Sequence, residues 1–351
     1  MKINTVILGA SGYVGGELLR LVKTHPNFDI IAAISDTYAG EEINNIFPHL
    51  AAPYHNEVFK SYKNWNKDID IGGSIAIFSA APHGISANLL AKMIDELSLN
   101  NINTRVVDAS ADFRFSDPDK FSQIYGIEHP QPELLEQFIC GVPEHTNDSS
   151  SYFVAHPGCF ASAILLALVP IISERITNDE YYISAITGST GSGRSPKKTT
   201  HHPERHSNIF AYKPLSHRHA PEIESLLGRV SSVKPKINFI PHSGPFSRGI
   251  YATVQAKLNI NLSTKEISSI YKKYYSGSEF VIYTEGPPQL KNVITSNYCH
   301  INSTVNDGQI VVNCAIDNLI KGSAGGSIQW MNRLWNLPET TGLMSITSPW
   351  V

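Results

Sequence analysis

Residues 3–22 read INTVILGASGYVGGELLRLV, and this stretch decides the fold of the N-terminal part of the chain. The β-rich run 3–8 stops at a glycine, and apolar residues then recur with helical spacing over 14–22. The pattern predicts a strand, a glycine turn and a helix. Such a turn lets the backbone approach a pyrophosphate at the helix N-terminus, or alternatively only packs the helix on the strand. The glycines concerned are Gly9, Gly12 and Gly15.

Strands and helices continue to alternate to about residue 157, which predicts a doubly wound α/β domain with a parallel sheet. The strands are expected at 30–34, 75–78, 105–108 and 152–155, with helical spacing at 89–97 and 164–172. Beyond residue 157 the pattern changes to α+β, with strands at 181–187, 236–240 and 251–260 and helices at 222–230 and 264–275. Residues 188–218 lack hydrophobic periodicity and are expected to form a long surface loop. We expect one domain at 1–157 plus a returning C-terminal helix at about 318–351, and a second at 158–317.

The composition describes an ordinary globular protein. The chain has 351 residues, a net charge of −3, 42 % hydrophobic and 17 % charged residues, which argues against disorder and against a nucleic-acid partner. No apolar stretch reaches the roughly 18 residues of a membrane span, and the first residues lack the pattern of a signal peptide. Four scattered cysteines without a CxxC pair suggest free thiols in a reducing compartment. We therefore expect a cytoplasmic protein with no membrane partner.

One cysteine has the sequence context of a nucleophile. Cys159 follows Pro157 and Gly158 and opens an apolar helix in VAHPGCFASAILLAL. Unpaired N–H groups and the helix dipole at such a position favour a thiolate, so we expect covalent catalysis, with a buried inert cysteine as the alternative. The remaining cysteines lie in or beside β-type runs and are expected to fill core positions: Cys140, Cys299 and Cys314.

Five of the 14 histidines fall between residues 201 and 219. Their irregular spacing lacks the frame of a metal site, and no metal is expected. His217 and His219 flank Arg218 just before a helix start, and an extended segment would put both imidazoles on one side. Because a thiol nucleophile needs a proton-transfer partner, one of the two is expected to act as acid/base; local capping or packing is the alternative.

Other polar residues suit a dinucleotide and an anionic substrate. Ser35 and Thr37 offer hydroxyls to a 2′-phosphate, whereas Asp36 between them suits the ribose diol of NAD, so these residues leave the cofactor open. Guanidinium forks suit carboxylate or phosphate groups, although each arginine could instead form a surface ion pair. The candidate arginines are Arg114, Arg194 and Arg248. Lys197 and Lys198 are expected on a solvated loop face.

Segments spread over nearly the whole chain resemble the N-acetyl-γ-glutamyl-phosphate reductases of arginine biosynthesis, within the semialdehyde dehydrogenase group. These segments are GASGYVGGELLRL, YAG with FPHL, APHG, DASADFRF, HPGCFAS, TGSTGSGR, HRHAPEIE and NLIKGSAGGSIQWMN. Their order and spacing are specific, above all HPGC followed by GSGR and HRHAPE. A similar reductase of lysine and arginine synthesis acts on phosphorylated 2-aminoadipate or glutamate attached to an amino-group carrier protein, and it remains the alternative.

The resemblance implies a Rossmann domain that binds NADP, a catalytic α+β domain of the semialdehyde dehydrogenase type, and a homotetramer or homodimer. Cys159 would attack a small-molecule acyl phosphate, and phosphate would leave. NADPH would deliver hydride to the thioester, and the adduct would release N-acetylglutamate 5-semialdehyde. His219 is the implied acid/base, with His217 close by.

The resemblance also implies a set of binding residues. Those for the cofactor are Gly9, Ser11, Gly12, Tyr13, Val14, Ser35, Thr37, Ala81, Pro82, Gly188, Gly191 and Asn318. Those for the substrate are Ser110, Arg114, Arg194 and Glu222. The chain departs from the family at Thr37 and Tyr38, where an arginine or lysine is common. Its SPKKTTHHPERHSN run is longer and more basic than in many members, and would suit an acidic carrier protein, a neighbouring subunit or plain solvent.

Overall fold

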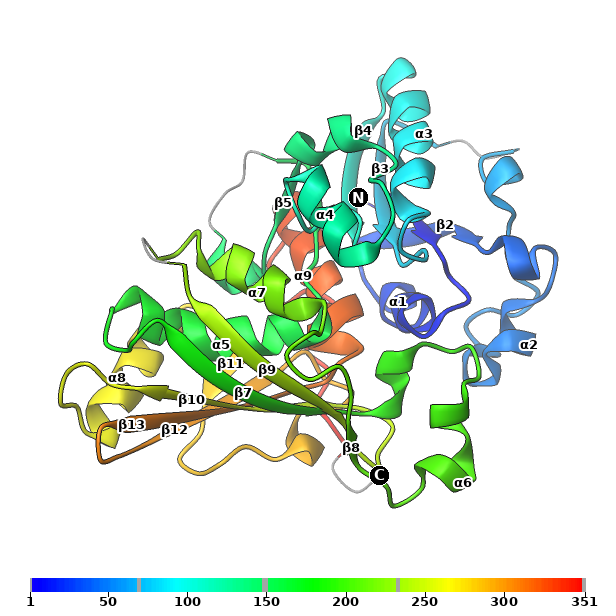
Figure 1. Cartoon of the computed structure of the whole chain (residues 1–351). Helices are drawn as coiled ribbons and strands as arrows, with labels where there is room; N and C mark the ends of the chain where they lie inside the picture. The colour runs from blue at the N-terminus through cyan, green and yellow to red at the C-terminus, as the bar shows by residue number, and fades with distance from the viewer. Residues whose placement is uncertain (1, 68–70, 147–150, 232–233, 349–351) are drawn as a thin grey trace. The chain divides into compact units, whose positions relative to one another are not determined.

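The computed structural model describes residues 2–67, 71–146, 151–231 and 234–348 (Figure 1). The chain forms two compact units. The first comprises Met1–Cys140, Asp148–His156 and Ala324–Met344, and the second comprises Gly141–Asn147, Pro157–Ser323 and Ser345–Val351. Among the described residues no helix is both long and apolar enough to cross a membrane.

The first unit is built on a six-stranded sheet in the order β2-β1-β3-β4-β6-β5, in which every neighbouring pair is parallel. Its strands are β1 (Ile3–Leu8), β2 (Phe28–Ile34), β3 (Ser74–Ser79), β4 (Asn103–Asp108), β5 (Phe138–Cys140) and β6 (Phe153–Ala155). Its helices are α1 (Tyr13–Lys23), α2 (Ile43–Ile46), α3 (Ser86–Leu99), α4 (Pro118–Tyr125) and α9 (Gly325–Leu334). The prediction of a doubly wound parallel α/β domain is confirmed.

The turn between β1 and α1 is made of backbone in close contact. Gly9 has a φ of +68°, and a Cβ on it would lie 2.4 Å from the carbonyl oxygen of Ala80. A Cβ on Gly15, inside α1, would lie 2.5 Å from the carbonyl oxygen of Gly9. Gly12 is the N-cap of the helix and meets only the Gly9 oxygen, at 3.6 Å. The three glycines therefore let α1 pack closely on β1. Gly9 and Gly12 also leave the N-terminus of α1 without a Cβ atom over it.

The second unit is built on a seven-stranded mixed sheet in the order β11-β12-β13-β10-β7-β9-β8. Its strands are β7 (Glu180–Thr187), β8 (Phe210–Ala211), β9 (Lys236–Ser243), β10 (Ile250–Lys257), β11 (Val281–Tyr283), β12 (Cys299–Asn306) and β13 (Gln309–Ile316). The helices α5 (Cys159–Ser173), α7 (His219–Leu227) and α8 (Thr264–Tyr274) pack on one face of this sheet (Figure 1). The predicted change from α/β to α+β is confirmed.

The face of the second sheet opposite these helices is only partly covered. On β7 the alternate residues Tyr181 and Ile183 are buried, whereas Tyr182 and Ser184 are exposed. The neighbouring strand β9 repeats this alternation, with Phe239 buried and Ile240 exposed. The three core cysteines predicted from the sequence, Cys140, Cys299 and Cys314, are buried thiols that form no disulfide bond.

Some segments differ from the sequence prediction. The expected loop 188–218 contains short helical turns, the short helix α6 (His202–Arg205) and the short strand β8. These elements were missed because two to four residues carry no detectable periodicity. No strand was predicted by its bounds at β5, β11, β12 or β13, although β-type runs were expected at or beside the cysteines that lie in β5, β12 and β13. Of the C-terminal helix expected at about 318–351, residues 349–351 lie outside the described residues. Within the described part the α-helix is α9, and it ends at Leu334, because Asn336 has a φ of +54° and Pro338 follows. A π-helical turn, Ile320–Ala324, precedes α9.

Replacing Gly15 by alanine is expected to destabilise the protein by about 1–3 kcal/mol, because the new methyl group has no room against the Gly9 carbonyl. Chemical denaturation of the purified variant measures this change. Gly73→Ala is the matched control, since a Cβ there meets nothing within 4 Å. Equal stability of the two variants would contradict the close packing.

Candidate active site

Cys159 is the first residue of α5 and lines a pocket in the second unit. Gly158, in extended conformation, is the N-cap, and the helix that follows is almost entirely buried. Cys159 is the one cysteine of the four that is partly exposed. A thiolate at this position is stabilised by the N–H groups and dipole of the helix N-terminus. Cys159 therefore lies at a helix N-terminus, as the sequence predicted.

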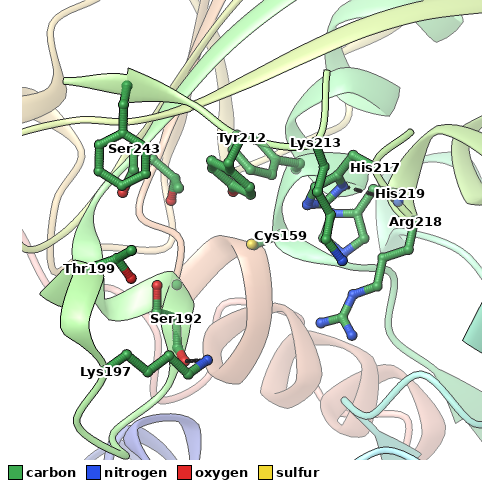
Figure 2. A pocket seen from close by; sticks show the side chains of 14 residues that line it. Cys159, Ser192, Lys197, Thr199, Tyr212, Lys213, His217, Arg218, His219 and Ser243 are labelled. Atoms are coloured by element: carbon green, nitrogen blue, oxygen red, sulfur yellow. Dashed lines mark hydrogen bonds between the residues drawn. The ribbon is translucent and has the colours of Figure 1, made fainter. Parts of the chain in front are cut away.

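The pocket has a volume of about 370 Å³, which suits a small metabolite. Figure 2 shows Cys159 between two groups of side chains. In this view Lys213, His217, Arg218 and His219 lie on one side of Cys159, Ser192, Lys197 and Thr199 lie on the other, and Tyr212 lies above it. The remaining lining residues are Phe160, Thr187, Gly191, Phe210 and Ser243.

The two predicted histidines meet at this pocket. Their ring centroids are 4.7 Å apart at an interplanar angle of 80°, and both rings pack edge-on against Phe160. His219 opens α7, so the expected extended segment is wrong at this point; the helical turn nevertheless keeps both side chains in the pocket lining. Nδ1 of His217 accepts a hydrogen bond from the backbone N–H of His219 at 3.2 Å. The neutral His217 ring therefore carries its proton on Nε2.

His217 is held in its neutral form. Burial, followed by the positive charges of Arg218 and Lys213, lowers the pKa of His217 to about 4. Burial and the neighbouring Cys159 raise the pKa of Tyr212, so its phenol stays protonated at neutral pH. The pocket thus offers one imidazole and one phenol as neutral hydrogen-bond donors beside the thiol.

Three cations line the pocket: Lys197, Lys213 and Arg218. Lys197 and Lys198 are exposed, as expected for a solvated loop face, and Lys197 in addition donates to the carbonyl oxygen of Ser192 at 3.0 Å. Lys213 has a φ of +47°, a conformation that costs free energy for a non-glycine residue and often marks a functional loop. Lys213 and Tyr212 were not singled out from the sequence; their position shortly before the two histidines is the signal that could have found them.

The predicted substrate residues lie outside the lining of this pocket. In the first unit, Ser110 donates to Asp108 at 2.6 Å, and Arg114 donates to the carbonyl oxygens of His156 and Ala109. In the second unit, the fully buried Glu222 accepts a hydrogen bond from the Gly158 N–H at 2.6 Å and so anchors the turn that carries Cys159. Arg194 is half-buried on the neighbouring loop.

A further predicted anion contact, Arg248, is used inside the second unit. Its guanidinium makes two hydrogen bonds to the buried carboxylate of Asp317, at 3.0 and 3.2 Å. Arg248 therefore forms an ion pair, but with a buried carboxylate and not at the surface as the alternative expected. No group of three or more possible metal ligands occurs in the part of the chain that the structure describes.

The predicted cofactor residues divide between the two units. In the first, Ser11 and Ser35 join their hydroxyls at 2.8 Å beside the glycine turn, and Asp36 accepts a hydrogen bond from the Tyr62 N–H. Also in this unit are Gly9, Gly12, Tyr13, Val14, Thr37, Ala81 and Pro82. In the second unit, Asn318 accepts from the Gly249 N–H and donates to Thr190, which ties it to the loop that contains Gly188 and Gly191.

The comparisons identify the family. Residues 4–151 match the model of the semialdehyde dehydrogenase NAD binding domain, and residues 159–318 match that of the semialdehyde dehydrogenase dimerisation domain. The chain belongs to the semialdehyde dehydrogenase family, a group of oxidoreductases.

The full-length relatives carry two names. N-acetyl-gamma-glutamyl-phosphate reductases of Bacillus cereus and Methanopyrus kandleri are 37 % and 36 % identical, over 98 % and 96 % of both chains. A LysW-L-2-aminoadipate/LysW-L-glutamate phosphate reductase of Saccharolobus solfataricus is 35 % identical over 97 % of both chains.

Solved structures support the fold. Aspartate semialdehyde dehydrogenase II of Vibrio cholerae matches with a TM-score of 0.68 at 13 % identity, over 96 % of this chain and 99 % of that one. The NADP complex of the Candida albicans aspartate semialdehyde dehydrogenase matches with a TM-score of 0.66 at 14 % identity, over 95 % and 99 %.

The charge state of His217 can be tested directly. Because burial and two neighbouring cations lower its pKa to about 4, the ring is expected to stay neutral as the pH falls from 8 to 5. NMR of the histidine-labelled protein, with His217→Asn for assignment, follows this titration. A midpoint near 6.5 for that resonance would contradict the burial argument.

Proposed function

We propose that the protein reduces N-acetyl-L-glutamyl 5-phosphate to N-acetyl-L-glutamate 5-semialdehyde with NADPH and releases phosphate. The observation that carries this proposal is the partly exposed Cys159 at the N-terminus of α5, in a pocket with two histidines and three cations. Full-length relatives with the corresponding name support the substrate. The reaction belongs to arginine biosynthesis.

Cys159 is the proposed nucleophile. Its sulfur attacks the acyl carbon, the bond from that carbon to the phosphate oxygen breaks, and a thioester forms as phosphate leaves. Bound NADPH would supply a hydride to the thioester carbonyl carbon, and the tetrahedral adduct on Cys159 would collapse to the aldehyde and return the thiolate. His219 is the proposed acid/base for this adduct, and the neutral His217 beside it holds a donor on Nε2.

Lys213, Arg218 and Lys197 are the proposed partners of the two anionic ends of the substrate, the phosphate and the carboxylate. Arg194 and Arg114 remain predictions for the same task, as does Ser110. The contacts of Glu222 favour a positioning role in place of direct substrate binding, because its carboxylate is buried against Gly158.

The proposed cofactor is NADPH, which supplies the hydride when bound. The glycine turn suits its pyrophosphate, because Gly9 and Gly12 leave the N-terminus of α1 free of Cβ atoms. The paired hydroxyls of Ser11 and Ser35 suit the adenosine ribose end. The NADP complex of the Candida albicans neighbour supports the choice. Gly188, Gly191 and Asn318 are proposed for the nicotinamide side.

We assign cofactor binding to the first unit, and catalysis and self-association to the second. The dimerisation-domain match over residues 159–318 supports a homodimer or homotetramer, and the open face of the second sheet carries exposed Tyr182, Ile240 and Ile282 for such a contact. All four cysteines are thiols outside any disulfide bond, which suits the cytoplasm.

The reverse reaction tests the proposed function. The purified protein is expected to reduce NADP when N-acetylglutamate semialdehyde and phosphate are both present, and Cys159→Ala is expected to lose this activity while it stays folded. Absorbance at 340 nm measures NADPH, and arsenate should replace phosphate. Turnover retained by the variant would overturn the role of Cys159.

The relatives named for LysW-linked substrates support a second candidate, a reductase of carrier-bound aminoadipate or glutamate phosphate. The same assay separates the two functions. Activity with the free acetylated semialdehyde excludes a strict need for the carrier, whereas activity only with the carrier-linked semialdehyde would select the second candidate.

The roles of the two histidines can be ranked. His219→Asn is expected to lower kcat by about 100-fold or more, because the acid/base is lost. His217→Asn should lower kcat less, since the neutral ring only supports its neighbour. Steady-state rates at pH 7.5 measure both, and the opposite order would reassign the acid/base to His217.

A further inference from the structure

A buried ion pair lies in the second unit away from the lining of the pocket. Lys321 Nζ and Glu144 Oε1 are 2.5 Å apart, and the two side chains are only 1 % and 3 % exposed. The ammonium also lies 5.4 Å from the centre of the Phe280 ring. Because both charges are removed from water, burying the pair costs free energy, which the contact between the two groups must offset.

Lys321 belongs to the π-helical turn Ile320–Ala324. Such turns are rare and frequently occur at functional sites. The next residue, Gly322, touches the nucleophile: a Cβ on it would lie 2.8 Å from Cys159 Cβ and 3.2 Å from Cys159 Cα. Only a hydrogen atom fits between the backbone of this turn and Cys159, so the position of the turn limits the position of the nucleophile.

The start of the turn is already fixed. Asp317 accepts hydrogen bonds from the N–H groups of Leu319 and Ile320 at 2.8 and 3.0 Å, and it also binds Arg248. Gly322 donates its N–H to the Asp317 carbonyl oxygen. The Lys321 side chain is the second attachment, because it ties the turn to Glu144, 177 positions away in the sequence.

Hydrogen bonds also connect the segment of Glu144 to α5, the helix that begins at Cys159. His145, the neighbour of Glu144, forms a hydrogen bond with the Tyr275 hydroxyl at 2.8 Å. That hydroxyl donates to the carbonyl oxygen of Leu166 in α5 at 2.6 Å. Both partners of the ion pair are thus linked to α5, one at its first residue and one in its middle.

We infer that the Lys321–Glu144 pair has a positioning role: it keeps Gly322 in contact with Cys159 and so holds the Cys159 sulfur at the N-terminus of α5. The inference rests on the proposed role of Cys159 as nucleophile. Neither member of the pair lines the pocket, so its removal acts on the reactivity of the thiol more than on substrate binding.

The test replaces the pair by apolar residues of similar size, Lys321→Met with Glu144→Leu, which avoids an unpaired buried charge. Gly322→Ala is the second variant and pushes Cys159 directly. Two controls repeat the same changes at exposed sites: Lys272→Met with Glu285→Leu at an exposed ion pair, and Gly277→Ala, where a Cβ meets nothing within 4 Å.

Two readouts are needed. The first is the pH dependence of Cys159 alkylation by iodoacetamide without substrate or cofactor, with Cys159→Ala as the blank. Its midpoint is expected to rise by at least about 0.5 pH unit in both variants, because the thiolate loses helix N–H donors. The second is steady-state kinetics, in which kcat is expected to fall about 10-fold or more with little change in KM.

Wild-type alkylation midpoints and kcat in the folded double variant would overturn the role of the ion pair, even if Gly322→Ala has an effect. Should the double variant fail to fold, Gly322→Ala decides, and an unchanged midpoint there overturns the inference. The alkylation assay uses no substrate, so it stays informative if the proposed reaction fails. Turnover by Cys159→Ala would instead overturn the proposed function on which the inference rests.

Discussion

The backbone around the first turn of α5 is the constraint on which the active site depends. Glu222 binds the N–H of Gly158 from one side, and the backbone of Gly322 touches Cys159 from another. Because both contacts are close, a shift of the backbone at this turn would also move the Cys159 sulfur. The pocket residues therefore surround a proposed nucleophile, Cys159, whose position is set by packing and by two backbone contacts.

The first unit uses the same kind of constraint at its glycine turn. Gly9 and Gly15 bring backbone atoms of β1, α1 and the end of β3 within contact distance, so the N-terminus of α1 stays open. Polar side chains fix the neighbouring strand ends, where Ser86 and Ser110 donate to the buried Asp108. Burial, with the nearby Asp112, raises the pKa of Asp108 to about 6. Both units thus fix their loops through local backbone contacts and buried polar groups.

The sequence predicts well what depends on neighbours along the chain. The strand, turn and helix at residues 3–22 and the helix start at Cys159 follow from periodicity and from glycine and proline positions. Contacts between residues far apart in the sequence cannot be predicted in this way. Arg248 and Asp317 are 69 positions apart, and the approach of Lys197 to the pocket depends on how its loop folds. The two histidines followed as a pair from their positions on either side of Arg218, and the family resemblance implied only which of them acts, whereas Lys213, Tyr212 and Gly322 needed the structure.

The most direct test of the account is to look for the acyl-enzyme. Mixing the protein with freshly prepared N-acetylglutamyl phosphate in the absence of NADPH should release one phosphate per active site. Intact-mass and peptide mass spectrometry should then find an N-acetylglutamyl group on Cys159, which is lost on addition of NADPH. Phosphate release without acylation of Cys159, or acylation at another residue, would contradict the thioester on which the proposed chemistry depends.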